Sequence, residues 1–357
     1  MTCMLQSLVY SHSCPISLYR VTEFCMTNYV NVCLSFDENY AQHAAVTMMS
    51  AVLNCSRPIA FYVLDSTPSC ISEHSKRMLN EAFQGTDAVI NFTSVDYKDY
   101  VNFPVWVVMK NSPKHCQYVP YYRLNLSNTL KDLNRVIYLD ADIVVTGDLS
   151  KLFDMELKTD NFVAGVNDMD CEELGRNIST NGYINSGVIL FDFKRIRESN
   201  LNVLDKCREL LSEKKTQLSL CLDQDLLNIA FNNHIEFIDL SWNAQSVGTS
   251  RGFTLGYDDQ SIPKNIIHFI ASHKPWMFNC KSQYQYLYFK YLAKTPWRIY
   301  AVKYFLIKIK KFLFEKKNIS ATTKHIIILG IPLLKRKIEA DRKKYSILGI
   351  KVFSYKK

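Results

Sequence analysis

Two aspartates one residue apart follow an apolar run in the middle of the chain. Residues 136–139 predict a strand, and Asp140 and Asp142 come directly after it. In an extended chain these two side chains point to the same face, so both can reach one divalent cation. Oxygen ligands of this kind suit Mg²⁺ or Mn²⁺, and a cation held there can neutralise a diphosphate. The alternative is a strand that runs into an aspartate-rich turn with solvated carboxylates.

Two further segments place amides beside predicted elements. The predicted strand over 183–192 contains Asn185 and Gly187, which offer a donor, an acceptor and close backbone approach. The alternative is a β-bulge, which explains the glycine but not the amide. A predicted helix over 222–231 begins with Asp223-Gln224-Asp225. Acidic residues in a first turn often only complement the helix dipole, which accounts for the aspartates better than for the glutamine.

A histidine and a lysine complete the candidate set. His268 ends an apolar strand, and Lys274 follows six residues later, before Pro275 and Trp276. A single histidine is usually structural. A histidine at a strand end with a nearby lysine is a candidate metal ligand next to a phosphate-binding cation.

Apolar runs and helical patterns alternate along the chain and must position these residues. Strands are predicted over 28–36, 59–64 and 88–92 and before Asp140, and helices over 40–53, 71–83 and 120–130. This rhythm predicts an α/β fold with a largely parallel sheet and helices on both faces. Ligands of such sheets bind beyond the carboxyl ends of the strands, where Asp37 and Asp140 lie.

Together, these segments resemble the family 8 glycosyltransferases, in particular the bacterial lipopolysaccharide or lipooligosaccharide galactosyl- and glucosyltransferases. The resemblance spans residues 29–276. It rests on segments in a fixed order: Ser-Phe-Asp-Glu-Asn-Tyr at 35–40, Tyr-Tyr-Arg-Leu at 121–124, Tyr-Leu-Asp-Ala-Asp at 138–142, Asn-Ser-Gly-Val at 185–188, Asp-Gln-Asp at 223–225, His268, and Lys-Pro-Trp at 274–276. One departure is Ala271-Ser272-His273, where similar proteins often carry Gly-Pro.

The resemblance implies a GT-A type fold, a mixed α/β sheet, and retaining transfer of a hexose from UDP-galactose or UDP-glucose to a lipid-linked saccharide acceptor. It implies that Mn²⁺ (or Mg²⁺) is bound by Asp140, Asp142 and His268. Contacts to the nucleotide and its phosphates are implied for Asp37, Asn39, Arg123, Asp140 and Lys274. The residues implied around the donor hexose are Asp168, Asn185, Asp223 and Gln224. His115 matches a position that contacts the acceptor.

Retention leaves two mechanisms open. Gln224 is a weak nucleophile, whereas Asp223 is in principle a better one for a double displacement. We favour attack from the same face as the leaving group, with both side chains stabilising the positive charge of the sugar; the alternative is a covalent intermediate.

The C-terminal region carries most of the positive charge. Residues 298–357 contain 17 Lys or Arg and 3 Asp or Glu, whereas the remainder has a net charge of −5. Apolar and aromatic residues recur at helical spacing over 298–317, flanked by lysines, which predicts an interfacial helix on an anionic membrane surface. The alternative is a helix packed on the catalytic domain with a disordered basic end. We expect no nucleic-acid binding, because no recognition motif accompanies the charge.

Eleven scattered cysteines include no Cys-x-x-Cys pair, which predicts reduced thiols and neither a zinc site nor a disulfide framework. No signal sequence or membrane span is predicted. We therefore expect a cytoplasmic protein that lies peripherally on the inner face of the cytoplasmic membrane. The predicted organisation is an N-terminal extension over 1–27, a catalytic domain over 28–280, and a basic aromatic membrane-associating region over 281–357.

Two rival functions remain open at this point. A haloacid-dehalogenase-like phosphatase also carries Asp-x-Asp after an apolar strand, although normally on the first strand, whereas three strands precede Asp140 here. A catalytically silent, membrane-associated nucleotide-sugar-binding protein would keep Asp37 and Asp140 but lose a metal ligand or a donor-sugar residue.

Overall fold

The computed structural model describes residues 28–106, 109–168, 182–212, 221–246, 264–270, 274–320, 323–328, 331–339, 342–347 and 350–356. The predicted N-terminal extension over 1–27 lies outside these residues. The segment Ala271-Ser272-His273 does too.

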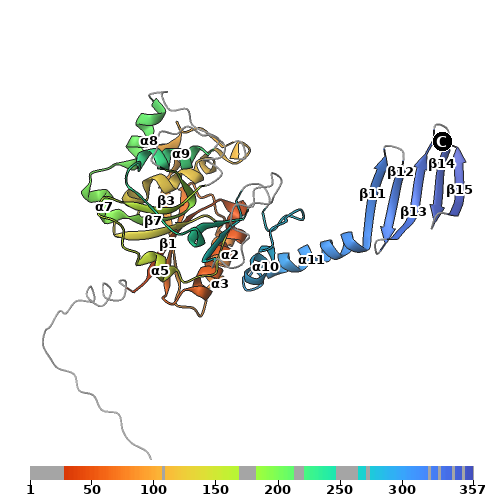
Figure 1. Ribbon diagram of the computed structural model, residues 1–357, viewed down its shortest axis with the longest axis horizontal. Helices are drawn as coiled ribbons and strands as arrows, with labels where there is room; N and C mark the ends of the chain where they lie inside the picture. The colour runs from red at the N-terminus through yellow and green to blue at the C-terminus, as the bar shows by residue number, and fades with distance from the viewer. Residues whose placement is uncertain are drawn as a thin grey trace, which may run out of the picture.

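A mixed sheet forms the centre of the fold (Figure 1). In the described ranges it has seven strands in the order β3-β2-β1-β4-β7-β6-β8. Their bounds are Val30–Ser35 (β1), Ile59–Thr67 (β2), Val89–Asp96 (β3), Arg135–Leu139 (β4), Val163–Asn167 (β6), Ile184–Asp192 (β7) and Ile235–Phe237 (β8). The neighbouring pairs β3–β2, β2–β1 and β1–β4 are parallel. Strand β7 is antiparallel to both β4 and β6. The predicted mixed α/β sheet is confirmed, and β7 is the main departure from a parallel one.

A second, smaller sheet lies next to the end of β4. It contains β5 (Ile143–Val145), β10 (Ile266–His268) and β9 (Ala244–Gln245). β10 pairs antiparallel with β5, and the register sets His268 opposite Ile143. Because Asp142 immediately precedes Ile143, this register brings the histidine to the aspartate pair.

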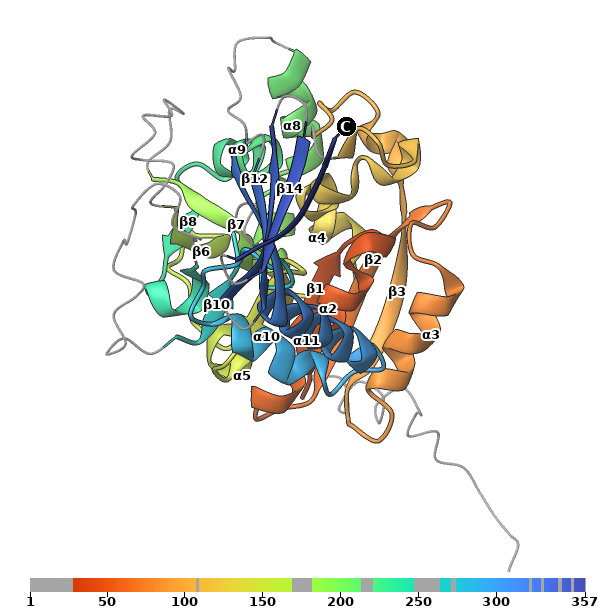
Figure 2. The same ribbon diagram turned by 90° about the vertical axis from the view of Figure 1, so that its right-hand side faces the viewer.

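Helices cover both faces of the central sheet, as Figures 1 and 2 show. The α-helices are α2 (Ala41–Asn54), α3 (Glu73–Ala82), α4 (Leu126–Thr129), α5 (Leu149–Phe153), α7 (Phe193–Glu198), α8 (Val203–Ser212), α9 (Leu222–Ala230), α10 (Gln285–Leu292) and α11 (Arg298–Leu313). Short 3₁₀ turns are η1 (Glu38–Tyr40), η2 (Tyr97–Tyr100), η4 (Lys114–Cys116), η5 (Val119–Asn125) and η6 (Leu240–Asn243).

The helix predicted over 120–130 is wrong in type for most of its length. The chain forms 3₁₀ turns over η5 and only a short α-helix, α4. Asn125, Ser127 and Thr129 favour caps and turns over helix interiors, and the side chain of Thr129 bonds back to the carbonyl of Asn125. The tighter 3₁₀ geometry matters because η5 carries Arg123.

Each face of the sheet packs against its own apolar cluster. Along β1, Val32 and Leu34 belong to the cluster with α2 and α10, whereas Cys33 belongs to the cluster with η5, α8 and α9. Successive side chains of β4 and of β7 also alternate between the two clusters. This period of two, with both faces buried, is why the strands have almost continuous apolar sequences.

The C-terminal region forms a helix and a separate sheet. Ala301 and Tyr304 of α11 are buried against the core that α2 and α10 share, and the rest of the helix leads away from it (Figure 1). An antiparallel sheet follows, consisting of β11 (Phe314–Ser320), β12 (Thr323–Ile328), β13 (Ile331–Ile338), β14 (Arg342–Ile347) and β15 (Ile350–Lys356). The predicted helix therefore ends at Leu313, and the alternative of a disordered basic end is wrong for these strands.

The sequence predicted no membrane span and no disulfide. Within the described ranges, no helix has the length and apolarity needed to cross a bilayer. Cys70 and Cys116 form a disulfide with their Cα atoms 5.6 Å apart, so the expectation of reduced thiols throughout is wrong for this pair. The two cysteines are 46 residues apart in sequence, and only the fold brings them together.

Candidate active site

The aspartate pair lies at the point where β4 leaves the sheet. The backbone N–H of Asp140 donates to the carbonyl of Gly187 on β7 (2.8 Å), which fixes the aspartate against the first half of the antiparallel strand. The next residues turn away and enter β5, and the N–H of Phe269 donates to the carbonyl of Asp142 (3.1 Å). Three strands therefore hold the short segment that carries both carboxylates.

Asp140, Asp142 and His268 form a cluster that could hold a metal ion. Their ligand atoms lie within 4.8 Å of one another. His268 Nε2 is 3.2 Å from Asp142 Oδ1 and 3.8 Å from Asp140 Oδ2. Asp142 Oδ1 is buried and has no hydrogen-bond partner among the described residues.

A hydrogen-bond chain determines which nitrogen of His268 faces the aspartates. Asn185 Oδ1 accepts from the backbone N–H of Gly187 (3.0 Å), so the atom of Asn243 that contacts Asn185 Oδ1 (3.0 Å) must be the donor Nδ2. Asn243 Oδ1 then faces His268 Nδ1 (3.0 Å), which must carry a proton. In the neutral ring Nε2 is therefore left with its lone pair toward the carboxylates. Acceptors that face each other in this way need a cation between them, so the cluster fits a divalent metal.

Gly187 is required for the cluster to close. A Cβ built at this position would lie 2.2 Å from His268 Cε1 and 2.7 Å from Asp140 Oδ2. Any larger residue would displace a ligand. The register between β6 and β7 shifts across this segment, so the alternative of a β-bulge is borne out. Within the bulge, the glycine makes room for two ligand side chains.

Arg123 connects this cluster to a second group of polar residues. Its buried guanidinium donates to Asp140 Oδ1 (2.8 Å), and its Nε lies 3.3 Å from Asp223 Oδ2. It also donates to the carbonyl of Ser186 (2.7 Å) and lies over the ring of Tyr138 (4.5 Å). One cation therefore pairs with two carboxylates, one just after β4 and one on α9.

The second group contains Asp168, Asn185 and Gln224. Asp168 Oδ2 accepts from Asn185 Nδ2 (3.1 Å) and from Gln224 Nε2 (2.8 Å). Gln224 Oε1 accepts from the N–H of Ser186 (2.9 Å), so both ends of this amide are held. Asn228 clamps α9 to β7 by bonding to both backbone groups of Ile184.

Asp223 is buried at the edge of this group. Trp106 Nε1 donates to Asp223 Oδ1 (3.1 Å), and Arg123 faces the other oxygen. Burial raises the pKa of the Asp223 carboxyl to about 6, against the opposing charge of Arg123. This carboxyl titrates close to neutral pH.

Lys274 lies on the other side of the aspartate pair. Its ammonium contacts Asp142 Oδ2 and donates to the carbonyl of Phe269 (2.7 Å). Burial alone would raise the pKa of the Asp142 carboxyl, but the positive charge of Lys274 holds that pKa well below its usual range. Asp142 is therefore an ionised carboxylate, as a metal ligand must be.

The remaining predicted residues form separate groups. Asp37 accepts from the backbone and side-chain N–H groups of Asn39 (both 3.1 Å), at the end of the strand next to β4. His115 lies beside the Cys70–Cys116 disulfide. The structure thus brings together nine of the sequence-predicted residues and places Asp37, Asn39 and His115 outside that network. The nine are Asp140, Asp142, His268, Lys274, Arg123, Asp223, Gln224, Asn185 and Asp168.

Sequence reasoning missed Asn243 and Trp106. Asn243 is fully buried and connects the histidine to the amide group, and Trp106 holds Asp223. The signal for Asn243 was an amide between Trp242 and Ala244, just before a short strand. Nothing local distinguishes Trp106.

Comparison with known proteins agrees with this geometry. A family model described as glycosyl transferase family 8 matches residues 31–280. General stress protein A of Bacillus subtilis (strain 168) is 30% identical over 276 residues, which cover 73% of this chain and 92% of that protein. The lipopolysaccharide 1,3-galactosyltransferase of Salmonella typhimurium is 26% identical over 275 residues, or 72% of this chain and 76% of the relative.

Among solved structures, the galactosyltransferase LgtC in complex with donor and acceptor sugar analogs is similar, with a TM-score of 0.61 and 23% identity. The match covers 75% of this chain and 96% of that one. The predicted GT-A type fold is thereby confirmed. The chain belongs to glycosyl transferase family 8.

Asn243 generates a prediction about metal affinity. In Asn243→Leu, His268 loses the acceptor that fixes its tautomer, and we expect the affinity for Mn²⁺ to fall roughly 10–100-fold. Asn243→Asp is the matched control, because a carboxylate still accepts from Nδ1–H and should bind Mn²⁺ more tightly than the leucine variant. Calorimetric titration of the purified protein with MnCl₂ measures both. Equal affinities in the wild type and the leucine variant would contradict the assignment.

Proposed function

We propose that this protein is a retaining glycosyltransferase that moves a hexose, galactose or glucose, from a UDP-sugar to a lipopolysaccharide-type saccharide acceptor with the help of Mn²⁺ or Mg²⁺. The observation that carries the proposal is the connection through Arg123 between a three-ligand metal cluster and a group of buried amides and carboxylates. A donor with a charged diphosphate at one end and a hydroxylated sugar at the other matches these two halves.

Asp140, Asp142 and His268 would hold the cation. When bound, the divalent ion supplies Lewis-acid stabilisation of the charge that develops on the leaving diphosphate. A cation at Asp142 also competes with Lys274 for the same carboxylate. The lysine ammonium is then available to donate to a phosphate oxygen, where it adds a second positive charge.

The amide group suits the sugar half of the donor. Asp168, Asn185 and Gln224 hold one another in fixed orientations, so their remaining donors and acceptors are pre-organised for hydroxyl groups. Gln224 is engaged at both ends of its amide, which favours a positioning role over nucleophilic attack. Asp223, ionised beside Arg123, can stabilise positive charge on the sugar. These contacts support same-face attack as the retaining mechanism.

Binding of UDP is proposed for the end of β1. Asp37 and Asn39 lie at the carboxyl end of a strand adjacent to β4, and ligands of open α/β sheets bind at such edges. Tyr40 follows them and stands among aromatic neighbours, with its ring 5.8 Å from that of Trp276. This edge offers polar and aromatic contacts to a nucleobase and ribose.

The two rival functions fit less well. A phosphatase of the haloacid-dehalogenase type would need a free nucleophilic carboxylate, whereas Asp140 is bound to Arg123 and faces His268. Membership in a glycosyltransferase family also argues against it. A silent nucleotide-sugar-binding protein would lack part of the ligand or sugar set, and the full set is present.

Metal-dependent donor hydrolysis tests the proposed activity. We expect slow UDP release from UDP-galactose or UDP-glucose in the presence of Mn²⁺, and a loss of roughly 10²–10³-fold in Asp142→Asn, which removes a ligand charge. Asp132→Asn, at an exposed carboxylate, is the matched control and should behave as the wild type. Binding of UDP without hydrolysis or transfer to any saccharide would favour the silent binding protein.

The raised pKa of Asp223 predicts that the rate of donor hydrolysis depends on pH. Its raised pKa of about 6 means that the carboxylate gains a proton as the pH falls through 6. If the ionised form supports the reaction, kcat/KM for donor hydrolysis should fall about tenfold per pH unit below that point. Asp223→Asn should be slower and should lack this acidic limb. A wild-type profile that stays flat between pH 5 and 7, with the metal site saturated, would show that ionised Asp223 is not required.

We propose a lipid-linked acceptor and attachment of the enzyme to the membrane that carries it. Relatives named as lipopolysaccharide 1,3-galactosyltransferase and lipopolysaccharide 1,2-glucosyltransferase support a lipid-linked saccharide acceptor. Helix α11 presents apolar side chains that are 45–60% exposed, namely Ile299, Tyr300, Val302, Phe305, Leu306, Ile307 and Ile309. Lysines interrupt this surface, as in helices that lie at anionic interfaces. We place the enzyme on the cytoplasmic face of the membrane, with a catalytic domain over 28–280 and a membrane-associating region over 281–357.

Vesicle binding tests the role of α11. Deleting the helix would uncover core residues that pack against Ala301 and Tyr304, so substitution is the sharper test. Leu306→Glu with Ile309→Glu should weaken sedimentation with vesicles that contain phosphatidylglycerol roughly tenfold, because two apolar contacts are replaced by like-charge repulsion. Leu53→Glu, at an exposed leucine on α2, is the control. Unchanged binding of the double variant would exclude α11 as the anchor.

A further inference from the structure

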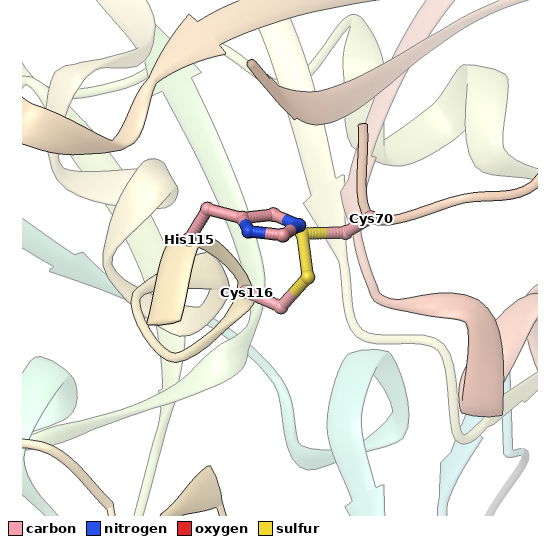
Figure 3. Close-up of side chains that lie close together, drawn as sticks. All are labelled: Cys70, His115 and Cys116. Carbon is pink, nitrogen blue, oxygen red and sulfur yellow. A yellow bond between two sulfur atoms is a disulfide. The ribbon is translucent and has the colours of Figure 1, made fainter. Parts of the chain in front are cut away.

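Outside the network around Arg123, two sulfur atoms and an imidazole lie together. Cys70 lies just after β2, and Cys116 ends η4. A ring nitrogen of His115 lies within 4.8 Å of both sulfur atoms, and Figure 3 shows the ring against the bond that joins them. The two cysteines are buried and His115 is only half-buried, so the histidine is the more exposed side of this group.

Cys70 is tied to the proposed nucleotide loop. Its carbonyl accepts from the backbone N–H of Glu38 (2.8 Å), the residue between Asp37 and Asn39. Its own N–H donates to the buried carboxylate of Asp65 (2.7 Å). This side of the disulfide is therefore firmly anchored.

The other side leads to the loop that carries His115 and to η5. The carbonyl of His115 accepts from Ser66 Oγ (3.2 Å) and from Tyr122 Oη (3.3 Å), and Tyr122 precedes Arg123. The ring of Tyr97 contacts His115 edge-on and stacks on Tyr118. These contacts are weak or aromatic, so the covalent bond is the strongest tie between this loop and the sheet.

Two buried thiols elsewhere in the described residues are poorly suited to oxidation. Burial raises the pKa of the Cys33 thiol far above its ordinary value, and it raises that of Cys207 to about 12. The thiolate is the reactive form of cysteine, so these two stay inert. Neither Cys33 nor Cys207 is disulfide-bonded.

We propose that Cys70 and Cys116 are a reversible dithiol–disulfide site, with His115 as its proton carrier, that sets the affinity of the enzyme for its acceptor. A disulfide in a protein that works in the reducing cytoplasm is typically a sensor or a catalytic pair. The inference that the pair is reversible rests on the cytoplasmic location proposed above, and the acceptor readout rests on the proposed activity, whereas formation of the bond by peroxide depends on neither.

The oxidant is hydrogen peroxide. One cysteine thiolate attacks a peroxide oxygen, the O–O bond breaks, and a sulfenic acid and hydroxide form. The second thiol gives its proton to His115 and attacks the sulfenic sulfur. The S–S bond forms, the S–O bond breaks, and the leaving hydroxide takes up the proton as water. Each sulfur loses one electron and the peroxide gains two; a dithiol reductant reverses the change.

The disulfide fixes the loop that carries His115. In the oxidised enzyme this loop is therefore already ordered when the saccharide acceptor binds. We expect reduction to raise KM for a lipooligosaccharide-type acceptor roughly five- to tenfold, because the loop must then be ordered on binding. Hydrolysis of the donor without acceptor should be unchanged.

The test uses the full-length protein after treatment with hydrogen peroxide or with a phosphine reductant. Peptide mapping should find Cys70 joined to Cys116 only after peroxide, and backbone hydrogen exchange over residues 109–125 should be faster in the reduced protein. A Cys70→Ser, Cys116→Ser double variant should match the reduced enzyme under both conditions. Cys55→Ser, at a half-buried thiol, should keep the full redox response.

The outcomes separate this proposal from the proposed function. A redox-dependent link with altered exchange, in a protein that transfers no sugar, would uphold the thiol site and remove the transferase. Normal transfer with an acceptor KM that is insensitive to peroxide and reductant would overturn the thiol proposal alone. Binding of one Zn²⁺ by the reduced protein, lost in the double variant and accompanied by resistance to peroxide, would overturn it in favour of a metal site.

Discussion

The site depends on the ion pairs that the buried guanidinium of Arg123 makes with Asp140 and Asp223. A charge taken out of water is costly unless it is paired and hydrogen-bonded, and here two carboxylates, a backbone carbonyl and an aromatic face surround it. The same contacts hold β4, β7 and α9 at one point. Loss of this cation would leave the buried Asp223 without its opposite charge and Asp140 without its closest cation, so the metal half and the sugar half of the site cannot be assembled independently.

The elements were predictable where their periodicity was strong. Buried strands such as β1 and β7 have apolar sequences, and α2 and α9 begin and end close to their predicted bounds. The direction of β7 was not predictable, because an apolar run looks the same in parallel and antiparallel pairings and only tertiary contacts decide. The 3₁₀ path of η5 was missed for a related reason: the tertiary contacts of Arg123 override a helix-like pattern.

The candidate site was predictable to the extent that its residues stand at the ends of strands and helices. Asp140, Asp142 and His268 interrupt or end apolar runs, and this signal survives without a structure. Residues that act through a partner far along the chain leave no such signal. Asn243 is recognised only from its contact with His268, and Trp106 only from its contact with Asp223, which lies 117 positions away. Cys70 and Cys116 were misjudged because spacing alone does not report a pairing between two loops.

The single backbone hydrogen bond between Asp140 and Gly187 limits how the family can vary in length. A shift of β7 by one residue would turn every side chain of the strand to the opposite face and would set Ser186 or Val188, each with a Cβ, against His268. An insertion or deletion that moves this register would displace several side chains of the site at once, whereas a substitution changes one. Length variation in this protein and its relatives should therefore be found in connections that leave the β4–β7 register unchanged, and selection should act on spacing as strictly as on residue identity.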